Sequence, residues 1–136
     1  MGEKEELLTE VMRQVQRKYM RFAEIEKLTN ELGDTLSRGD RESVQLLLEM
    51  RQDEMEEADS IERGIAAILR AVASNTADEI RGLLDCTKEL PSDEIGFEAK
   101  KIKELSRQIR RSVDRTISVD RAISQKLAGK DSYYSE

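Results

Sequence analysis

Apolar residues recur along this chain at intervals of three and four positions, the spacing of one face of an α-helix. Residues 3–38 carry a seam that resembles a heptad repeat, made of Val11, Val15, Phe22, Ile25, Leu32 and Leu36, with Leu8 and Leu28 widening it. Residues 41–72 carry two adjoining stripes, Val44, Leu48, Met55, Ile65, Leu69 and Val72 beside Leu47, Ile61 and Ile68. The pattern predicts two long helices.

A short polar segment, Ser37-Arg38-Gly39-Asp40, separates these two stretches. Gly39 can adopt the left-handed conformation that ends a helix. Asp40 can cap the next helix by accepting hydrogen bonds from its free backbone amides. Because the connection is so short, the second helix must fold back along the first, and the segment predicts a helical hairpin.

A short third helix is expected over residues 77–89. Thr76 followed by Glu79 matches the Thr-x-x-Glu capping box that begins a helix. Pro91 would stop this helix, and Ser92 or Asp93 could cap the following one. The apolar positions expected to line the third helix are Ile80, Leu83, Leu84 and Leu90.

A fourth helix is expected over residues 93–128, with Gly129 as its terminator. Its apolar stripe consists of Ile102, Leu105, Ile109, Val113, Ile117, Ile123 and Leu127. The segment 129–136 is polar apart from Tyr133 and Tyr134, and we expect it to be mobile. It has no role, or it covers an apolar groove when no client is present, or it orders on binding.

The expected fold is all-α: an elongated antiparallel helical bundle built on a long hairpin, with coiled-coil-like packing, in one domain over residues 1–136. The composition agrees, since 38% of the residues are charged and 38% are hydrophobic, with one proline and no tryptophan. Such a composition is typical of solvated helices with narrow apolar stripes. A helical bundle of this size is only marginally stable, so a partner or a second copy could stabilise it.

Charge is segregated between the second and fourth stretches. Residues 53–62 are rich in Asp and Glu, whereas residues 100–115 are rich in Lys and Arg. Either the two helices lie near each other and their charges specify which helices are neighbours, or the basic face binds an acidic partner. Arg51 falls on an apolar seam, where its stem could pack with its head in solvent, or it could form an ion pair that sets helix register.

The residues argue against several classes of protein. The net charge of −6 argues against nucleic-acid binding. The chain lacks an apolar run long enough to span a membrane, a signal peptide and a myristoylation pattern, so a cytoplasmic protein is expected. Absence of histidine removes the commonest general base and metal ligand, and the lone Cys86 is expected to be a small structural side chain within the third helix. No catalytic residue, cofactor or metal is expected.

The sequence around the hairpin, from Leu36-Ser37-Arg38-Gly39-Asp40 through the Leu-rich turn Leu46-Leu47-Leu48 to Arg51-Gln52, resembles the flagellar type III export chaperones of the FlgN and FliT types. The resemblance covers about residues 5–72 and is closer to the FlgN type in length and in the long fourth helix. Arg51-Gln52 stands where these families have Lys followed by Glu or Gln.

This resemblance implies a cytoplasmic chaperone that binds the C-terminal helical segment of a secreted hook-associated or filament-cap protein. It would prevent premature assembly of that client and deliver it to the export apparatus. The alternatives are a self-associating coiled-coil adaptor, with a homodimer left open, and an enzyme like the all-helical chorismate mutases, with which the seam position of Arg51 is compatible.

A client helix would bind through spaced apolar anchors in a groove on the bundle. The groove is expected along the fourth helix, beyond the part that the short third helix can cover. The residues predicted to contact the client are Ile109, Val113 and Ile117, with Tyr133 and Tyr134 from the tail. The alternative for the three aliphatic residues is ordinary core packing.

Overall fold

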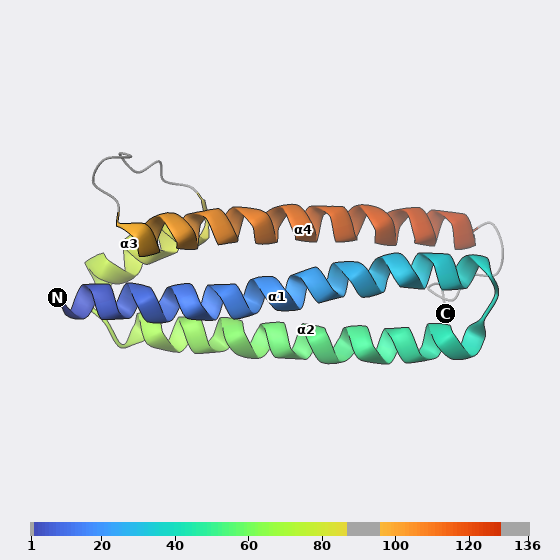
Figure 1. The fold of residues 1–136 in the computed structure, drawn as a ribbon, viewed down its shortest axis with the longest axis horizontal. Coiled ribbons are helices and arrows are strands. Elements are labelled where there is room, and N and C mark those ends of the chain that lie inside the picture. Colours follow the sequence, from blue (N-terminus) through green and yellow to red (C-terminus); the bar gives the residue numbers. More distant parts are fainter. Residues whose placement is uncertain (1, 87–95, 129–136) are drawn as a thin grey trace.

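The computed structural model describes residues 2–86 and 96–128. In these ranges the chain forms four α-helices and no β-strand: α1 (Glu3–Ser37), α2 (Arg41–Arg70), α3 (Ser74–Leu84) and α4 (Phe97–Ala128). The three long helices pack side by side, with α2 antiparallel to α1 and α4 running in the same direction as α1 (Figure 1). The prediction of an all-α helical bundle on a hairpin is confirmed.

The turn between α1 and α2 follows the predicted chemistry. Gly39 has a φ of +71°, in the left-handed region. Its amide donates to the Leu36 carbonyl oxygen (3.1 Å) and the Asp40 amide to that of Thr35 (3.4 Å), the two bonds of a Schellman motif. The Asp40 carboxylate then accepts a hydrogen bond from the Ser43 amide (3.1 Å) and caps α2. Both predicted roles are confirmed.

We expect Gly39→Ala to lower the free energy of unfolding by about 1 kcal/mol, because an L-residue with a side chain resists the left-handed conformation. A Cβ at this position would meet nothing within 4 Å, so the cost is one of backbone conformation alone. Gly64→Ala is the matched control: a Cβ there also meets nothing, but Gly64 lies inside α2, and alanine should add about 0.5–1 kcal/mol. Urea denaturation of both variants measures the difference, and equal effects would contradict this account of the turn.

The third helix begins and ends earlier than the sequence predicts. The helix begins at Ser74, and no side chain caps it. The predicted capping box is therefore wrong. Thr76 lies inside the first turn, and Glu79 instead forms an ion pair with Lys4 at 2.8 Å. Nor does Cys86 lie within the helix. It follows the helix with a φ of +57°, where its amide donates to the Leu83 carbonyl oxygen (3.3 Å). The helix ends because this residue leaves the α-helical region.

The fourth helix begins at Phe97, directly after the non-helical Gly96 and later than the predicted residue 93, and it is helical to Ala128, the last described residue. The proposed stop and caps at Pro91, Ser92 and Asp93, the proposed terminator Gly129, and Leu90 lie outside the described residues.

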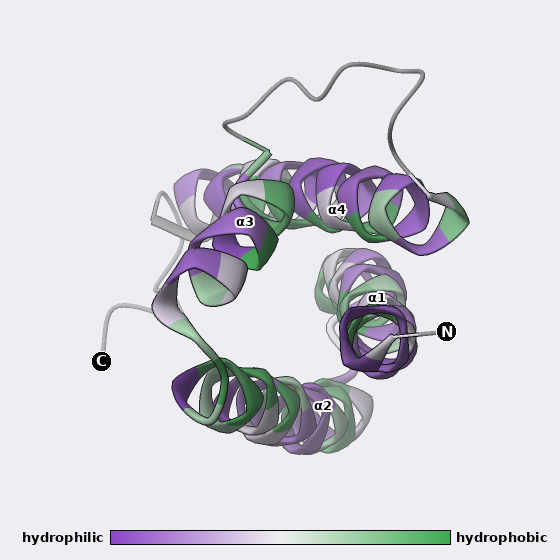
Figure 2. Ribbon diagram, turned by 90° about the vertical axis from the view of Figure 1, so that its left-hand side faces the viewer, coloured by the Kyte–Doolittle hydropathy of each residue, from purple (hydrophilic) through white to green (hydrophobic). Residues whose placement is uncertain are grey.

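Helix α1 is the common packing partner of the bundle. It packs along its length against both α2 and α4, while α3 contacts α2 and α4. Seen end-on, the four helices form the corners of a bundle with their apolar faces inward, and α3 stands between α2 and α4 (Figure 2). The main cluster of buried side chains draws on all four helices: Val11, Val15, Ile61, Ile65, Leu69, Ala77, Ile80, Leu83, Ala99, Ile102, Leu105 and Ile109.

The segregated charges of α2 and α4 are paired mainly through α1. On α2, Glu62 pairs with Lys18 of α1 at 2.7 Å, and on α4 Arg115 also pairs with α1. In the described residues one ion pair joins α2 to α4 directly, and its cation, Arg51, comes from the acidic helix while Asp120 comes from the basic one. The expectation that opposite net charges make α2 and α4 direct neighbours is therefore wrong: each is placed by α1.

Candidate functional site

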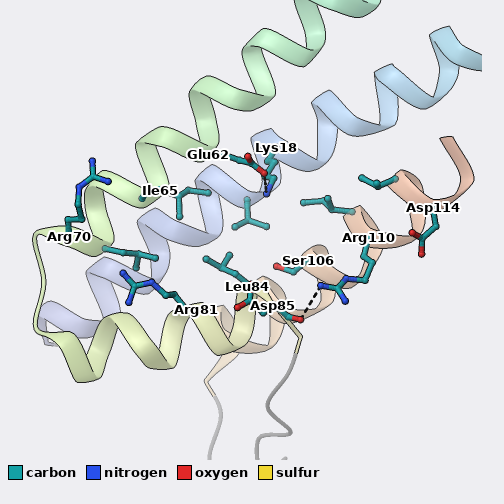
Figure 3. Close-up of a pocket in the computed structure, with 15 residues that line it drawn as sticks. Lys18, Glu62, Ile65, Arg70, Arg81, Leu84, Asp85, Ser106, Arg110 and Asp114 are labelled. Atoms are coloured by element: carbon teal, nitrogen blue, oxygen red, sulfur yellow. Dashed lines mark hydrogen bonds and ion pairs between the residues drawn. The ribbon is translucent and has the colours of Figure 1, made fainter. Parts of the chain in front are cut away.

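A groove opens between α2 and α4 where α3 ends. It has a volume of about 950 Å³ and is open to solvent, with α1 forming its floor. In a regular four-helix bundle, a full-length helix at the position of α3 would cover this space. Here α3 spans only Ser74–Leu84 and covers one end of it (Figures 1 and 3).

The surface of the groove combines apolar side chains with charged ones. The apolar residues come from all four helices, and one small residue, Ala66 of α2, is exposed on the wall. The large apolar side chains are Val15, Ile65, Leu69, Leu84, Ile109 and Val113. Such an apolar lining with a charged rim is typical of grooves that bind amphipathic helices.

Of the five predicted contact residues, two line this groove. Ile109 is buried and Val113 is half-buried, and both also contribute to the main core, so their groove and core roles coexist. Ile117 lies one turn beyond Val113 on the same face of α4 and is 43% exposed. Tyr133 and Tyr134 lie outside the described residues.

The buried face of α4 changes from apolar to polar residues after Ile109. The next two seam positions, at intervals of three and four residues, are Ser112 and Thr116, which are 1% and 8% exposed. The Ser112 hydroxyl donates to Glu26 of α1 (2.7 Å), and that of Thr116 to the Ser112 carbonyl oxygen (2.8 Å). Small polar side chains are therefore buried here, while Val113 is half-buried and Ile117 is left largely exposed.

A polar cluster joins the three long helices beyond the groove lining. Arg51 of α2 donates through Nη1 to the Asp120 carboxylate of α4 (2.8 Å) and to the Thr29 hydroxyl of α1 (3.1 Å). Thr29 is fully buried and donates in turn to the Ile25 carbonyl oxygen (2.7 Å). The predicted ion pair of Arg51 is present, and its contacts tie together the three long helices; that it sets helix register stays a prediction.

A second polar cluster joins α1 to α4. The Glu26 carboxylate accepts hydrogen bonds from Arg115 Nε (2.7 Å) and Nη2 (3.1 Å) and from the Ser112 hydroxyl. The bonds from Arg115 chiefly, and that from Ser112, hold the pKa of Glu26 below its usual 4.5, against the opposing effect of burial. The ionised carboxylate therefore stabilises the folded state above the pKa it has in the unfolded chain, and that stability is lost as the pH falls through the lowered folded pKa.

We expect Glu26→Gln to reduce the pH dependence of stability on the acidic side. Wild-type protein loses this contribution as the pH falls below the usual pKa of 4.5 and through the lowered folded pKa, while the variant lacks it at every pH. Urea midpoints at about pH 6 and pH 3 measure the difference. Glu31→Gln, which changes an exposed carboxylate of the same helix, is the control and should keep the wild-type dependence. The same dependence in all three proteins would exclude Glu26 from the acid response.

Sequence reasoning missed the charged rim of the groove. Arg70, Arg81 and Arg110 come from three different helices and line the groove near α3 (Figure 3). Nothing in the local sequence marks them, because each is an ordinary surface position of its own helix. Ala66 was missed for the same reason, because it lines the groove only since α3 is too short to cover it.

The described residues offer little else that resembles a reactive site. They contain no group of three or more His, Cys, Asp or Glu side chains arranged to hold a metal ion. The thiol of Cys86 is half-buried and lies near the Lys103 carbonyl oxygen (3.8 Å). None of the described helices carries an apolar window sufficient to cross a bilayer.

Comparisons with protein families, with curated proteins and with solved structures found no match to this chain.

Proposed function

We propose that this protein binds an amphipathic helix of a partner in the groove between α2 and α4. The observation that carries the proposal is that, beyond Ile109, apolar side chains of α4 are partly exposed while small polar ones beside them are buried. Val113 is half-buried and Ile117 is 43% exposed, whereas the neighbouring Ser112 and Thr116 are buried. Apolar side chains at a spacing of four residues on an open helix face are the anchors that a helix-in-groove complex uses.

The dimensions of the open face match a helix of moderate length. Along α4 the groove lining runs from Ser106 to Asp114, and the exposed Ile117 and the Arg51–Asp120 ion pair follow on the next turns. From Ser106 to Asp120 the helix rises by fourteen steps of 1.5 Å, which is about 21 Å. A partner helix of about four turns would complete the fourth corner of the bundle where α3 leaves it open.

Within this class of function we propose an export chaperone. The resemblance of residues 5–72 to the FlgN and FliT types supports it, and so does the mode of binding. A groove that covers the apolar face of a client helix prevents that face from assembling with other proteins. The client would be a secreted hook-associated or filament-cap protein, received in the cytoplasm and passed to the export apparatus.

A self-associating adaptor remains the second candidate, because α2 exposes two large apolar side chains one turn apart. Leu46 is 57% and Met50 is 42% exposed. Sedimentation equilibrium distinguishes the two functions: an adaptor forms a dimer that Leu46→Asp dissociates, whereas a chaperone that is free of its client is monomeric.

We expect Ile117→Asp to abolish binding of an amphipathic probe helix, because a carboxylate replaces an anchor, while the helicity of the protein is retained since Ile117 is 43% exposed. The probe is a fluorescent peptide of about 14 residues with leucines at intervals of three and four, measured by anisotropy. Met20→Asp is the control, because Met20 is 58% exposed and lines a different hollow with Arg17 and Glu57. Equal affinities for both variants would refute the groove, and unfolding of the Ile117 variant would place this residue in the core.

A further inference from the structure

The rim of the groove is charged unevenly along its length. At the end next to α3 three arginines line it, Arg70 from α2, Arg81 from α3 and Arg110 from α4 (Figure 3). Further from α3 the lining includes Asp114, and a pair in which Lys18 and Glu62 neutralise each other at 2.7 Å. The α3 end is therefore the positive end of the groove.

The positive charge at this end is only partly satisfied within the chain. Arg70 is exposed and forms no ion pair in the part of the chain that the structure describes. Arg81 pairs with Asp78 at 3.2 Å in an exposed i,i+3 pair, which contributes little and is easily exchanged. The carboxylate of Asp85 also lines this end, but Arg110 donates to its backbone carbonyl oxygen (3.3 Å).

The bond from Arg110 also affects the direction in which a helix would bind. The free carbonyls at the C-terminal end of α3 carry partial negative charge, which would attract the N-terminus of a neighbouring helix. Because Arg110 caps the Asp85 carbonyl, this attraction is offset. The three arginines outnumber the carboxylates of Asp78 and Asp85, and the remaining positive charge favours the C-terminal end of a bound helix, with its own free carbonyls and any carboxylates of its last turn.

We infer that the occupant of the groove is an amphipathic helix with carboxylates in its C-terminal turn, bound with that turn beside Arg70, Arg81 and Arg110. This inference rests on the proposed function. Lysine or arginine in the first turns of the same helix would lie toward Asp114. The bound helix runs antiparallel to α1 and α4, so its direction is fixed by the charges at the two ends of the groove.

The test uses two probe peptides of the same composition, each about 14 residues long with leucines at helical spacing. One carries glutamates in the last turn and lysines in the first, and the other has these charges exchanged. Wild-type protein should bind the first about tenfold more tightly at low salt, and high salt should reduce the preference.

Two double variants of the protein test whether the arginines cause the preference, rather than a difference between the two peptides in their free state. Arg70→Gln combined with Arg110→Gln should reduce the preference to less than about threefold. Arg107→Gln combined with Arg111→Gln removes the same charge from exposed positions that do not line the groove, and should leave the preference unchanged. Circular dichroism checks that both double variants keep the helicity of the wild type.

The outcomes distinguish this inference from the proposed function. If both peptides bind with equal affinity and Ile117→Asp abolishes both, the groove binds helices but the inferred polarity is wrong. A preference for the exchanged peptide, or a preference that both double variants lose equally, also overturns the inference. If neither peptide binds, the proposed function and the inference are both wrong.

Discussion

Replacing Ile102 with alanine is expected to lower the free energy of unfolding by about 3 kcal/mol, because a fully buried side chain is cut back to a methyl group. Ile102 lies on α4, has no exposed surface and belongs to the cluster that all four helices share. Both the lost transfer free energy and the cavity left behind contribute to this cost. For a chain of this size the melting temperature should fall by about 10 °C.

The matched control is the same substitution on the same helix at Ile117. This side chain is 43% exposed, so its truncation should change the free energy of unfolding by less than about 1 kcal/mol. Thermal and urea unfolding of the two variants, followed by circular dichroism, measures the difference. Equal losses would show that Ile117 is packed as tightly as Ile102, and the open face of α4 would then be part of the core.

Replacing Ala66 with tryptophan is expected to weaken binding of the amphipathic probe peptide by at least about tenfold. Ala66 is exposed on the α2 wall of the groove, where a large ring would occupy the space that the helix needs. Because no core side chain is changed, the unfolding midpoint should stay near that of the wild type. Anisotropy titration of the labelled peptide measures the affinity.

The neighbouring residue provides the control for this experiment. Ala67 is also exposed on α2 but does not line the groove, so Ala67→Trp should bind the probe as the wild type does. The two variants have the same composition and the same helix propensity. If both lose affinity equally, the effect of the ring is not local to the groove, and if neither does, the probe binds elsewhere.

Features that depend on a few consecutive residues could be predicted from the sequence. The hairpin is the clearest case, since the left-handed Gly39 and the capping Asp40 act on their own backbone neighbours. The extents of α1 and α2 follow from long periodic stripes in the same way. The capping box at Thr76 failed because the turn after Ala71 begins α3 two residues before this threonine.

Features that depend on packing between helices could be predicted only in part. The sequence places Val113 and Ile117 on the apolar stripe of α4, but it does not reveal that the neighbouring Ser112 and Thr116 are buried. A serine or threonine in a helix carries no signal of burial, because its hydroxyl can be satisfied by a backbone carbonyl or a carboxylate of a neighbour. The arginine rim could not be predicted at all, since it is assembled from three helices by the early end of α3.

The most direct test of the helix-binding groove is an intermolecular methyl NOE measurement. The protein is labelled on its Ile, Leu and Val methyl groups, and the unlabelled probe peptide with glutamates in its last turn is added. The groove account predicts NOEs from the leucines of the peptide to the methyl groups of Ile65, Val113 and Ile117. NOEs confined to Leu46, an exposed apolar residue of α2 outside the groove, would contradict it.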